Sequence, residues 1–166
     1  MSDLTTIYSE IIDALTYEAY QNKRKFDKIF IMIINDNIQI RKSFINLLET
    51  KKVFEVIEAS NGVEAIYNLG KYEDKIKMIL CDYDMPLMNG EDFFNFASKA
   101  KLIENISVVL IANNLEKKKI IDLLRKGFYY FIMTPFSEEE FYEILRDAVF
   151  KKKRTLEQLI NDVVNY

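Results

Sequence analysis

The chain has 166 residues, of which 49% are hydrophobic and 30% charged, a composition that fits one globular domain with a small extension. Its net charge of −3 and its lack of any run of 18 uncharged apolar residues predict a protein that neither binds nucleic acid directly nor spans a membrane. There is no histidine and one cysteine, Cys81, which excludes histidine-dependent catalysis, histidine-ligated zinc and an internal disulfide bond. The single cysteine fits a reducing compartment, and the first ten residues do not form a secretory leader, so we expect a cytoplasmic protein.

Apolar residues at helical intervals between Leu4 and Ala19 predict an amphipathic helix at the start of the chain. Beyond it, short apolar runs alternate with segments of helical spacing. The predicted strands are residues 28–34, 53–59, 77–81, 106–112 and 128–133. The predicted helices are residues 38–50, 63–73, 91–102, 115–126 and a last helix that begins at Ser137. Strict alternation with short links indicates right-handed crossovers, so we expect an α/β fold with a doubly wound, five-stranded parallel sheet.

The last helix is expected to continue far beyond the sheet. Its apolar stripe follows alternating steps of four and three through Leu145, Val149, Lys152, Leu156, Leu159 and Val163. We therefore divide the chain into an N-terminal helical extension (1–26), a main domain (27–150) and a C-terminal helical extension (151–166). Such helices most often pack on their own domain. The alternative is that they form a homodimer interface or a docking surface for a partner.

Polar residues follow the predicted strands where ligands bind in open parallel sheets. The pairs at these ends are Asn35-Asp36, Cys81-Asp82, Ala112-Asn113 and Thr134-Pro135. Asp36 and Asp82 are expected to converge on one rim, with Asp84 two residues further on. Hard oxygen ligands of this kind suit Mg²⁺. A carboxylate beside Mg²⁺ can also accept a phosphoryl group.

The segments IINDN, LCDYDMPLMNG, IANN and MTPF occur in this order at the strand ends, and they resemble the receiver domain of bacterial response regulators. The resemblance covers about residues 27–150 and implies a CheY-like fold with strand order 2-1-3-4-5. It implies a two-component phosphorelay in which a sensor histidine kinase or a phosphotransfer protein acts upstream. It further implies that Asp82 is the phosphoacceptor, that Asp36 and Asp82 bind Mg²⁺ with the backbone carbonyl of Asp84, and that Phe131 is the switch aromatic.

Three positions depart from the receiver pattern. Asn35 replaces an acid, Ala112 replaces a serine or threonine, and Thr134 replaces a lysine. Ala112 cannot donate a hydrogen bond and Thr134 carries no positive charge, although the net charge of these positions together with Asp36 and Asp82 is unchanged. We therefore expect an atypical receiver that binds Mg²⁺, holds a phosphoryl group poorly and acts through protein–protein interaction. The alternative is a conventional Mg²⁺-dependent aspartyl-phosphate switch.

Two other protein classes fit the residues less well. A phosphohydrolase of the haloacid dehalogenase type would use Asp82 and Asp84 as a DxD pair, but Pro86 stands where that family has threonine or valine. A flavodoxin-like carrier of FMN would need a hydroxyl-rich loop after the first strand, where this chain is acidic. We expect no enzyme. About sixteen residues follow Phe150, so output is expected through an unidentified target protein. Whether the bond before Pro135 is cis stays open at this point.

Overall fold

The computed structural model describes residues 3–21, 29–48, 54–72, 75–152, 155 and 157–158. The strands are β1 (Ile29–Ile34), β2 (Phe54–Ala59), β3 (Ile76–Asp82), β4 (Ser107–Ala112) and β5 (Tyr130–Met133). The helices are α1 (Leu4–Gln21), α2 (Ile38–Leu48), α3 (Gly62–Tyr72), α4 (Gly90–Lys99), α5 (Lys117–Arg125) and α6 (Glu138–Val149). Every predicted strand is present, and each end lies within two residues of its predicted position.

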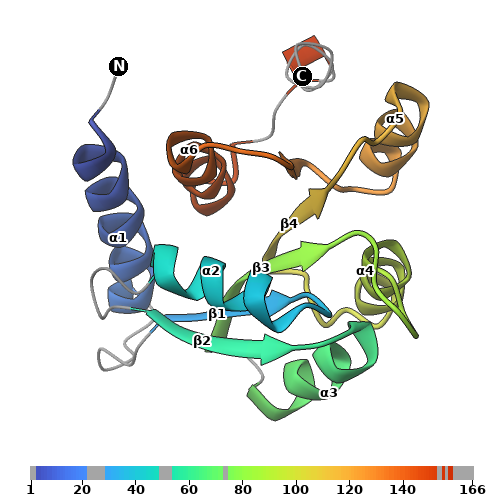
Figure 1. Ribbon diagram of the computed structural model, residues 1–166. Coiled ribbons are helices and arrows are strands. Elements are labelled where there is room, and N and C mark those ends of the chain that lie inside the picture. Colours follow the sequence, from blue (N-terminus) through green and yellow to red (C-terminus); the bar gives the residue numbers. More distant parts are fainter. Residues whose placement is uncertain are drawn as a thin grey trace.

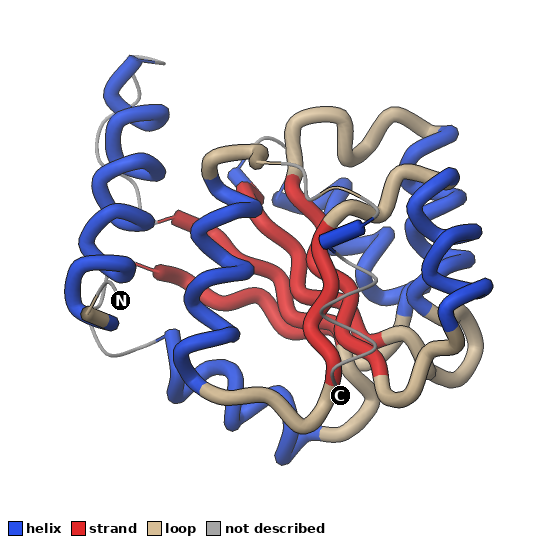
Figure 2. Tube along the Cα trace, turned by 90° about the horizontal axis from the view of Figure 1, so that it is seen from above, coloured by secondary structure: helices blue, strands red, loops and turns tan. Residues whose placement is uncertain are grey.

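The five strands form one parallel sheet with the order β2-β1-β3-β4-β5, as the fold class predicted (Figure 1). Seen from above, helices lie on both sides of the sheet (Figure 2). The sheet has a hydrophobic core on each of its two faces. Successive side chains of a strand point to opposite faces, so alternate residues of each strand belong to different cores. Ile31 and Ile33 belong to the core cluster beneath α1, α2 and α6, whereas Met32 and Ile34 belong to the cluster beneath α3 and α4.

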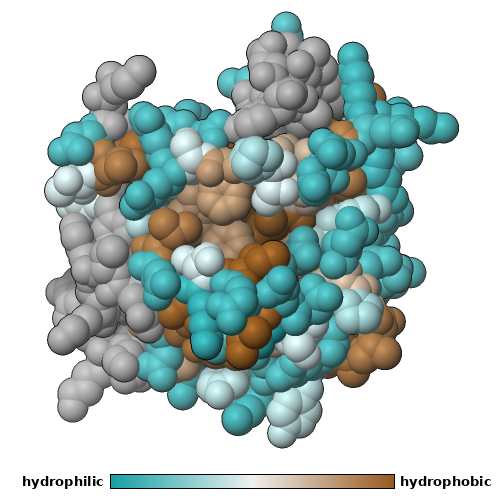
Figure 3. Space-filling view, in the orientation of Figure 1, coloured by the Kyte–Doolittle hydropathy of each residue, from teal (hydrophilic) through white to brown (hydrophobic). Residues whose placement is uncertain are grey.

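The helices α2 and α6 meet over the first of these faces. The rings of Phe44, Phe136 and Phe141 pack there with centroids 5.7 to 5.9 Å apart. Figure 3 shows apolar side chains gathered on this side of the molecule, in the region between the two helices. The helices cover the faces of the sheet, so the carboxyl ends of the strands are flanked by the connecting loops.

The amphipathic helix predicted at the start of the chain is present as α1, and it packs against α6 (Figure 1). Ile7 and Ile11 are completely or almost completely buried in the same core cluster as β1. Glu10 lies 3.9 Å from the guanidinium group of Arg146 on α6. The apolar face of α1 is therefore used within its own chain. The division of the chain at residues 26 and 150 stays a prediction, and residues 22–28 lie outside the described part.

The predicted long last helix is wrong. The capping box at Ser137 starts α6 as expected, but α6 ends at Val149. Lys151 adopts a left-handed backbone conformation with φ of 52°, and the N–H of Lys152 donates back to the carbonyl of Asp147 at 2.8 Å. The chain therefore turns where the apolar stripe is interrupted by lysine. Residues 159–166, the end of the predicted C-terminal extension, lie outside the described residues. Among the helices that are described, none is long and apolar enough to cross a membrane.

Candidate functional site at the carboxyl edge of the sheet

The acids at the strand ends share one edge of the sheet because β1 and β3 are adjacent and parallel. Ile34 is the register partner of Cys81, so the residues that follow them leave the sheet side by side. Asp82 is half-buried at the end of β3, whereas Asp36 and Asp84 lie in the flanking loops. The pKa of Asp82 is raised to about 6, mainly by burial and in part by the charges of Asp36 and Asp84, while the hydrogen bond from the N–H of Tyr83 opposes the rise. The structure thus brings the three predicted acids within electrostatic range of one another.

The loop after Asp82 folds back tightly on β3. The N–H of Tyr83 donates to the carbonyl of Ile111 at 2.8 Å, and the N–H of Gly90 donates to the carbonyl of Tyr83 at 3.0 Å. A Cβ atom on Gly90 would lie 2.4 Å from the carbonyl oxygen of Asp82, so α4 can begin against the end of β3 only with glycine at this position. The side chain of Asn89 caps α4. The MPLMNG segment therefore fixes the backbone of Asp82 and Tyr83 at the end of β3.

The loop after β1 carries Asp36 between two asparagines. Asn35 is buried, with an exposed fraction of 2%, and its side-chain oxygen accepts a hydrogen bond from the N–H of Asn37 at 2.8 Å. Asn37 in turn accepts from the N–H of Gln39 at 2.9 Å and so caps the start of α2. Where the receiver pattern has a second acid, this chain uses a neutral side chain that stabilises the turn.

The replaced positions on β4 and β5 contact each other. Thr134 donates from both its backbone N–H, at 2.9 Å, and its hydroxyl, at 3.3 Å, to the carbonyl of Ala112. The bond between Thr134 and Pro135 is cis. Phe131 is buried, with an exposed fraction of 5%, in a cluster with Leu110, Leu123 and Phe128. The hydroxyl of Thr134 is therefore directed to the backbone of β4, and Phe131 already occupies an inward position.

Sequence reasoning missed a polar cluster beside Asp82 that joins α4 to α5. Glu91 accepts hydrogen bonds from Lys119 at 2.6 Å, from Lys126, and from the hydroxyl of Tyr83 at 3.3 Å. Burial alone would raise the pKa of Glu91, but the hydrogen bonds and charges of these two lysines lower it overall. The ammonium of Lys119 also lies 5.7 Å from the centroid of the Tyr83 ring. We call Tyr83, Glu91, Lys119 and Lys126 the α4–α5 clasp.

With this geometry described, the chain can be compared with known proteins. The sequence pattern of the response regulator receiver domain matches residues 31–146, which is more than half of the chain. The chain belongs to the response regulator receiver domain family. This confirms the resemblance that the strand-end segments indicated.

Curated relatives of the receiver include chemotaxis proteins. It is 29% identical over 119 residues to the chemotaxis protein CheY homolog of Campylobacter jejuni, a match that covers 72% of this chain and 91% of the relative. It is 28% identical over 115 residues to chemotaxis protein CheY1 of Helicobacter pylori, covering 69% of this chain and 92% of the relative. The sequence similarity therefore extends over nearly the whole of each relative.

Solved structures share the fold of the receiver at lower identity. Vibrio cholerae chemotaxis protein CheY4 superposes with a TM-score of 0.65 at 20% identity, covering 74% of this chain and 99% of that one. A chain of the CheX–CheY–BeF₃–Mg²⁺ complex from Borrelia burgdorferi superposes with a TM-score of 0.64 at 23% identity, covering 74% of this chain and 89% of that one. These neighbours support the flavodoxin-like, CheY-like arrangement with strand order 2-1-3-4-5.

The oxygen atoms at the carboxyl edge of the sheet suit Mg²⁺ better than an ion whose ligands must all come from the protein. Within the described residues, no group of three or more histidine, cysteine, aspartate or glutamate side chains is arranged to hold a metal on its own. Mg²⁺ commonly binds through one or two carboxylates and keeps several waters. Asp36 and Asp82 could supply the carboxylates, and Asp84 could add its carbonyl. After burial, the charges of Asp36 and Asp84 also raise the pKa of Asp82, so a cation bound here would offset the repulsion among these acids.

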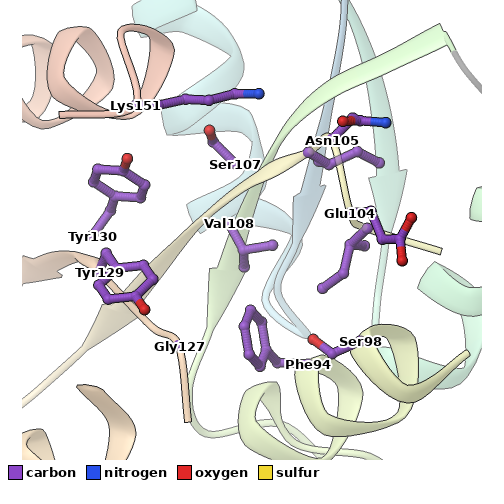
Figure 4. A pocket seen from close by; sticks show the side chains of 12 residues that line it. Phe94, Ser98, Glu104, Asn105, Ser107, Val108, Gly127, Tyr129, Tyr130 and Lys151 are labelled. Carbon is purple, nitrogen blue, oxygen red and sulfur yellow. The ribbon is translucent and has the colours of Figure 1, made fainter. Parts of the chain in front are cut away.

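A separate cavity of about 300 Å³ lies at the opposite edge of the sheet (Figure 4). It is lined by the amino ends of β4 and β5, by Phe94 and Ser98 of α4, and by Lys151 after α6. None of the acids of the carboxyl edge lines it. The cavity is therefore not part of the candidate phosphorylation site.

Proposed function

We propose that this receiver is an atypical member of a two-component phosphorelay, which binds Mg²⁺ at its acidic rim but acts mainly through protein contacts that do not depend on phosphorylation. The observation that carries this proposal is the contact between Thr134 and Ala112. One side chain is occupied by a backbone carbonyl and the other has no donor, so neither stabilises a phosphoryl group on Asp82.

In this proposal Asp82 is the phosphoacceptor. Its carboxylate is half-buried at the end of β3, and with a pKa of about 6 it is mostly ionised at neutral pH and able to act as a nucleophile. Asp36, Asp82 and the carbonyl of Asp84 would hold Mg²⁺, which when bound offsets the negative charge of the acids and of phosphoryl oxygens. The Borrelia burgdorferi complex, which shares this fold, contains both Mg²⁺ and beryllofluoride. That similarity supports a Mg²⁺ site in this receiver.

The proposed partners follow from this role. A sensor histidine kinase or phosphotransfer protein would act upstream, and a target protein would bind downstream, in the cytoplasm and without direct nucleic acid binding.

A homodimer through the terminal helices is a second route for output. It would have to use the outer surface of α1, because Ile7 and Ile11 are buried against the receiver itself. Light scattering on the full chain tests it, because a monomeric full chain would rule this route out.

The test of the proposed function is a titration of the full chain with Mg²⁺ and beryllofluoride, followed by amide chemical shifts. We expect Mg²⁺ to shift the amides of residues 35–37 and 82–84. We expect beryllofluoride to bind weakly, without shifts at Phe131. Asp82→Asn should abolish the beryllofluoride effect, whereas Asp84→Asn should preserve it because the carbonyl remains. Stoichiometric binding with shifts that reach Phe131 would instead establish the conventional aspartyl-phosphate switch.

The haloacid dehalogenase alternative has no support in the family match, and turnover of para-nitrophenyl phosphate tests it directly. We expect no turnover above that of Asp82→Asn. Hydrolysis that depends on Asp82 would overturn the assignment of a purely signalling role.

A further inference from the structure

Arg41, on the second turn of α2, contacts the carbonyl oxygens of the two peptide groups that flank the Cα atom of Asp36. One of its terminal nitrogens, Nη1, lies 2.7 Å from the carbonyl oxygen of Asn35 and 3.4 Å from that of Asp36. Its Nε donates to the carboxylate of Glu58 on β2 at 2.7 Å. The Arg41 side chain is largely buried, with an exposed fraction of 13%. A single guanidinium therefore connects the loop after β1 to the end of the neighbouring strand.

The anchor of Arg41 is itself fixed. Glu58 is near the end of β2, and its carbonyl accepts a hydrogen bond from the side-chain nitrogen of Asn68 on α3 at 3.1 Å. Asn68 is buried. The chain of contacts that runs from Asp36 through Arg41 to Glu58 therefore extends to α3, the helix that follows β2. Because β1 and β2 are in register, Ile33 being the partner of Glu58, the anchor cannot slide along the strand without breaking the sheet.

The backbone of Asp36 is therefore held from two directions, while its carboxylate stays available. Arg41 holds the carbonyl of Asn35, on the amino side of Asp36, and the hydrogen bond from the N–H of Asn37 to the side chain of Asn35 holds the side that leads into α2. The Asp36 side chain is exposed and makes no hydrogen bond to another residue within the described ranges. An acid presented in this way is arranged for a ligand rather than for an internal ion pair.

We propose that Arg41 is a positioning residue for cation binding: it orients Asp36 toward Asp82 by fixing the loop backbone, and Glu58 holds its guanidinium in place. The inference rests on the proposed Mg²⁺ site. It assigns Arg41 no contact with the ion or with a phosphoryl group. Its positive charge is directed to Glu58 and to two carbonyl oxygens, and the charges that act on Asp82 are those of Asp36 and Asp84.

Positioning and electrostatics predict opposite results when the charge of Arg41 is removed. A positive charge near a cation site repels the ion, so a purely electrostatic influence would make Mg²⁺ bind more tightly to Arg41→Gln. Loss of positioning makes Mg²⁺ bind more weakly. Arg41→Lys separates the two further, because an ammonium keeps the charge but cannot bond to Glu58 and two carbonyls with the planar geometry of a guanidinium.

The experiment is a Mg²⁺ titration of the full chain, monitored by the amide shifts of Asp36 and Asp82. We expect about a tenfold loss of Mg²⁺ affinity in Arg41→Gln, as is typical when a residue that orients a metal ligand is removed. Arg41→Lys should lose a similar factor, and Glu58→Gln a smaller one. The double variant Arg41→Gln/Glu58→Gln should lose no more than Arg41→Gln alone, because the two residues act as one unit.

Arg125→Gln is the matched control. Arg125 is exposed on α5, where it lies 3.6 Å from Asp122, so its loss changes the net charge equally without contacting the loop after β1. Its Mg²⁺ affinity should equal that of the wild type. Thermal unfolding checks that each variant is folded at the temperature of the titration. If Arg41→Gln is unfolded at that temperature, Arg41→Lys replaces it as the test variant. Unchanged or tighter Mg²⁺ binding by the Arg41 variants overturns this inference alone, whereas a wild type that binds no Mg²⁺ overturns the proposed metal site as well.

Discussion

The hydroxyl of Thr134 donates a hydrogen bond to the carbonyl oxygen of Ala112, with 3.3 Å between the two oxygen atoms. Thr134 directly follows β5 and Ala112 ends β4, at the edge of the sheet where Asp82 ends β3. The receiver pattern has a lysine and a hydroxyl-bearing residue at the two positions, both of which serve the phosphoryl group. In this chain Ala112 has no hydroxyl and the hydroxyl of Thr134 is bound to a backbone carbonyl, which is the basis of the proposed atypical function.

Restoring both groups should therefore restore phosphoryl binding. For Ala112→Ser combined with Thr134→Lys, we expect beryllofluoride to bind in the presence of Mg²⁺ at least about tenfold more tightly, because one hydrogen bond to a charged group contributes about 1.5 to 3 kcal/mol. Fluorine NMR measures the bound fraction, and the amide shift of Phe131 reports whether the signal crosses the sheet. Asn113→Ser, at an exposed neighbouring position, is the control. A double variant that binds no better than the wild type would contradict the explanation.

The pKa of Asp82 predicts a pH-dependent stability. Its carboxyl titrates at about 6 in the folded protein, above the ordinary value of 3.8, so the folded state holds the proton more tightly than the unfolded state. The favourable contribution is complete below about pH 3.8 and is lost as the pH rises through 6. At neutral pH, Asp82→Asn should raise the free energy of unfolding by about 1 to 2 kcal/mol, after allowance for solvent screening at this half-buried site.

Urea unfolding near neutral pH and near pH 4 checks this prediction. The gain in Asp82→Asn should disappear at the lower pH, where the wild-type carboxyl is protonated. Saturating Mg²⁺ should stabilise the wild type at neutral pH and leave Asp82→Asn unaffected. Glu104→Gln, which changes an exposed acid at the opposite edge of the sheet, is the control. Equal stabilisation at both pH values would show that burial does not shift the titration of Asp82 as described.

The parts of this structure that sequence could predict depend on local pattern. The runs that became β1, β3 and β4 are almost continuously apolar, because both faces of these strands are covered, and the strand-end acids followed from that placement. The end of α6 at Val149 was missed because an apolar stripe continued past it. The pairs Arg41–Glu58 and Lys119–Glu91 join residues 17 and 28 positions apart, so they depend on strand register and helix packing that no local pattern reveals.

The α4–α5 clasp should contribute to stability in a salt-dependent way. The Glu91 side chain has an exposed fraction of 12% and is paired with both Lys119 and Lys126. Replacing Glu91 with glutamine removes both ion pairs and should lower the free energy of unfolding by about 1 to 2 kcal/mol at low ionic strength, with a smaller loss at high ionic strength. Urea unfolding at two salt concentrations measures the difference.

Glu104→Gln is the control for the clasp. Glu104 lies 4.0 Å from Lys101 and both side chains are exposed, so its change should stay within about 0.5 kcal/mol. Because the pKa of Glu91 is lowered in the folded state, the contribution of the clasp is present above the ordinary pKa of glutamate and is lost as the pH falls through the folded value. A loss in Glu91→Gln no larger than in Glu104→Gln would mean that the clasp does not join the two helices energetically.

Two glycines make a matched pair that tests how the edge of the sheet is held. A methyl group on Gly90 would lie 2.4 Å from the carbonyl oxygen of Asp82 and 3.1 Å from a side-chain carbon of Leu110, whereas one on Gly70, in α3, would meet no atom within 4 Å. Gly70→Ala should therefore stabilise the protein by about 0.5 to 1 kcal/mol, because alanine favours the helix.

Gly90→Ala should instead lower the free energy of unfolding by about 2 kcal/mol or more, because the clash is with backbone that cannot move without displacing the end of β3. The displacement would move Asp82 away from Asp36, so Mg²⁺ affinity should fall together with stability. Urea unfolding and Mg²⁺ titration of both variants separate the two effects, since Gly70→Ala should leave Mg²⁺ binding unchanged. If Gly90→Ala bound Mg²⁺ like the wild type, the close contact between α4 and the end of β3 would not be what fixes the position of Asp82.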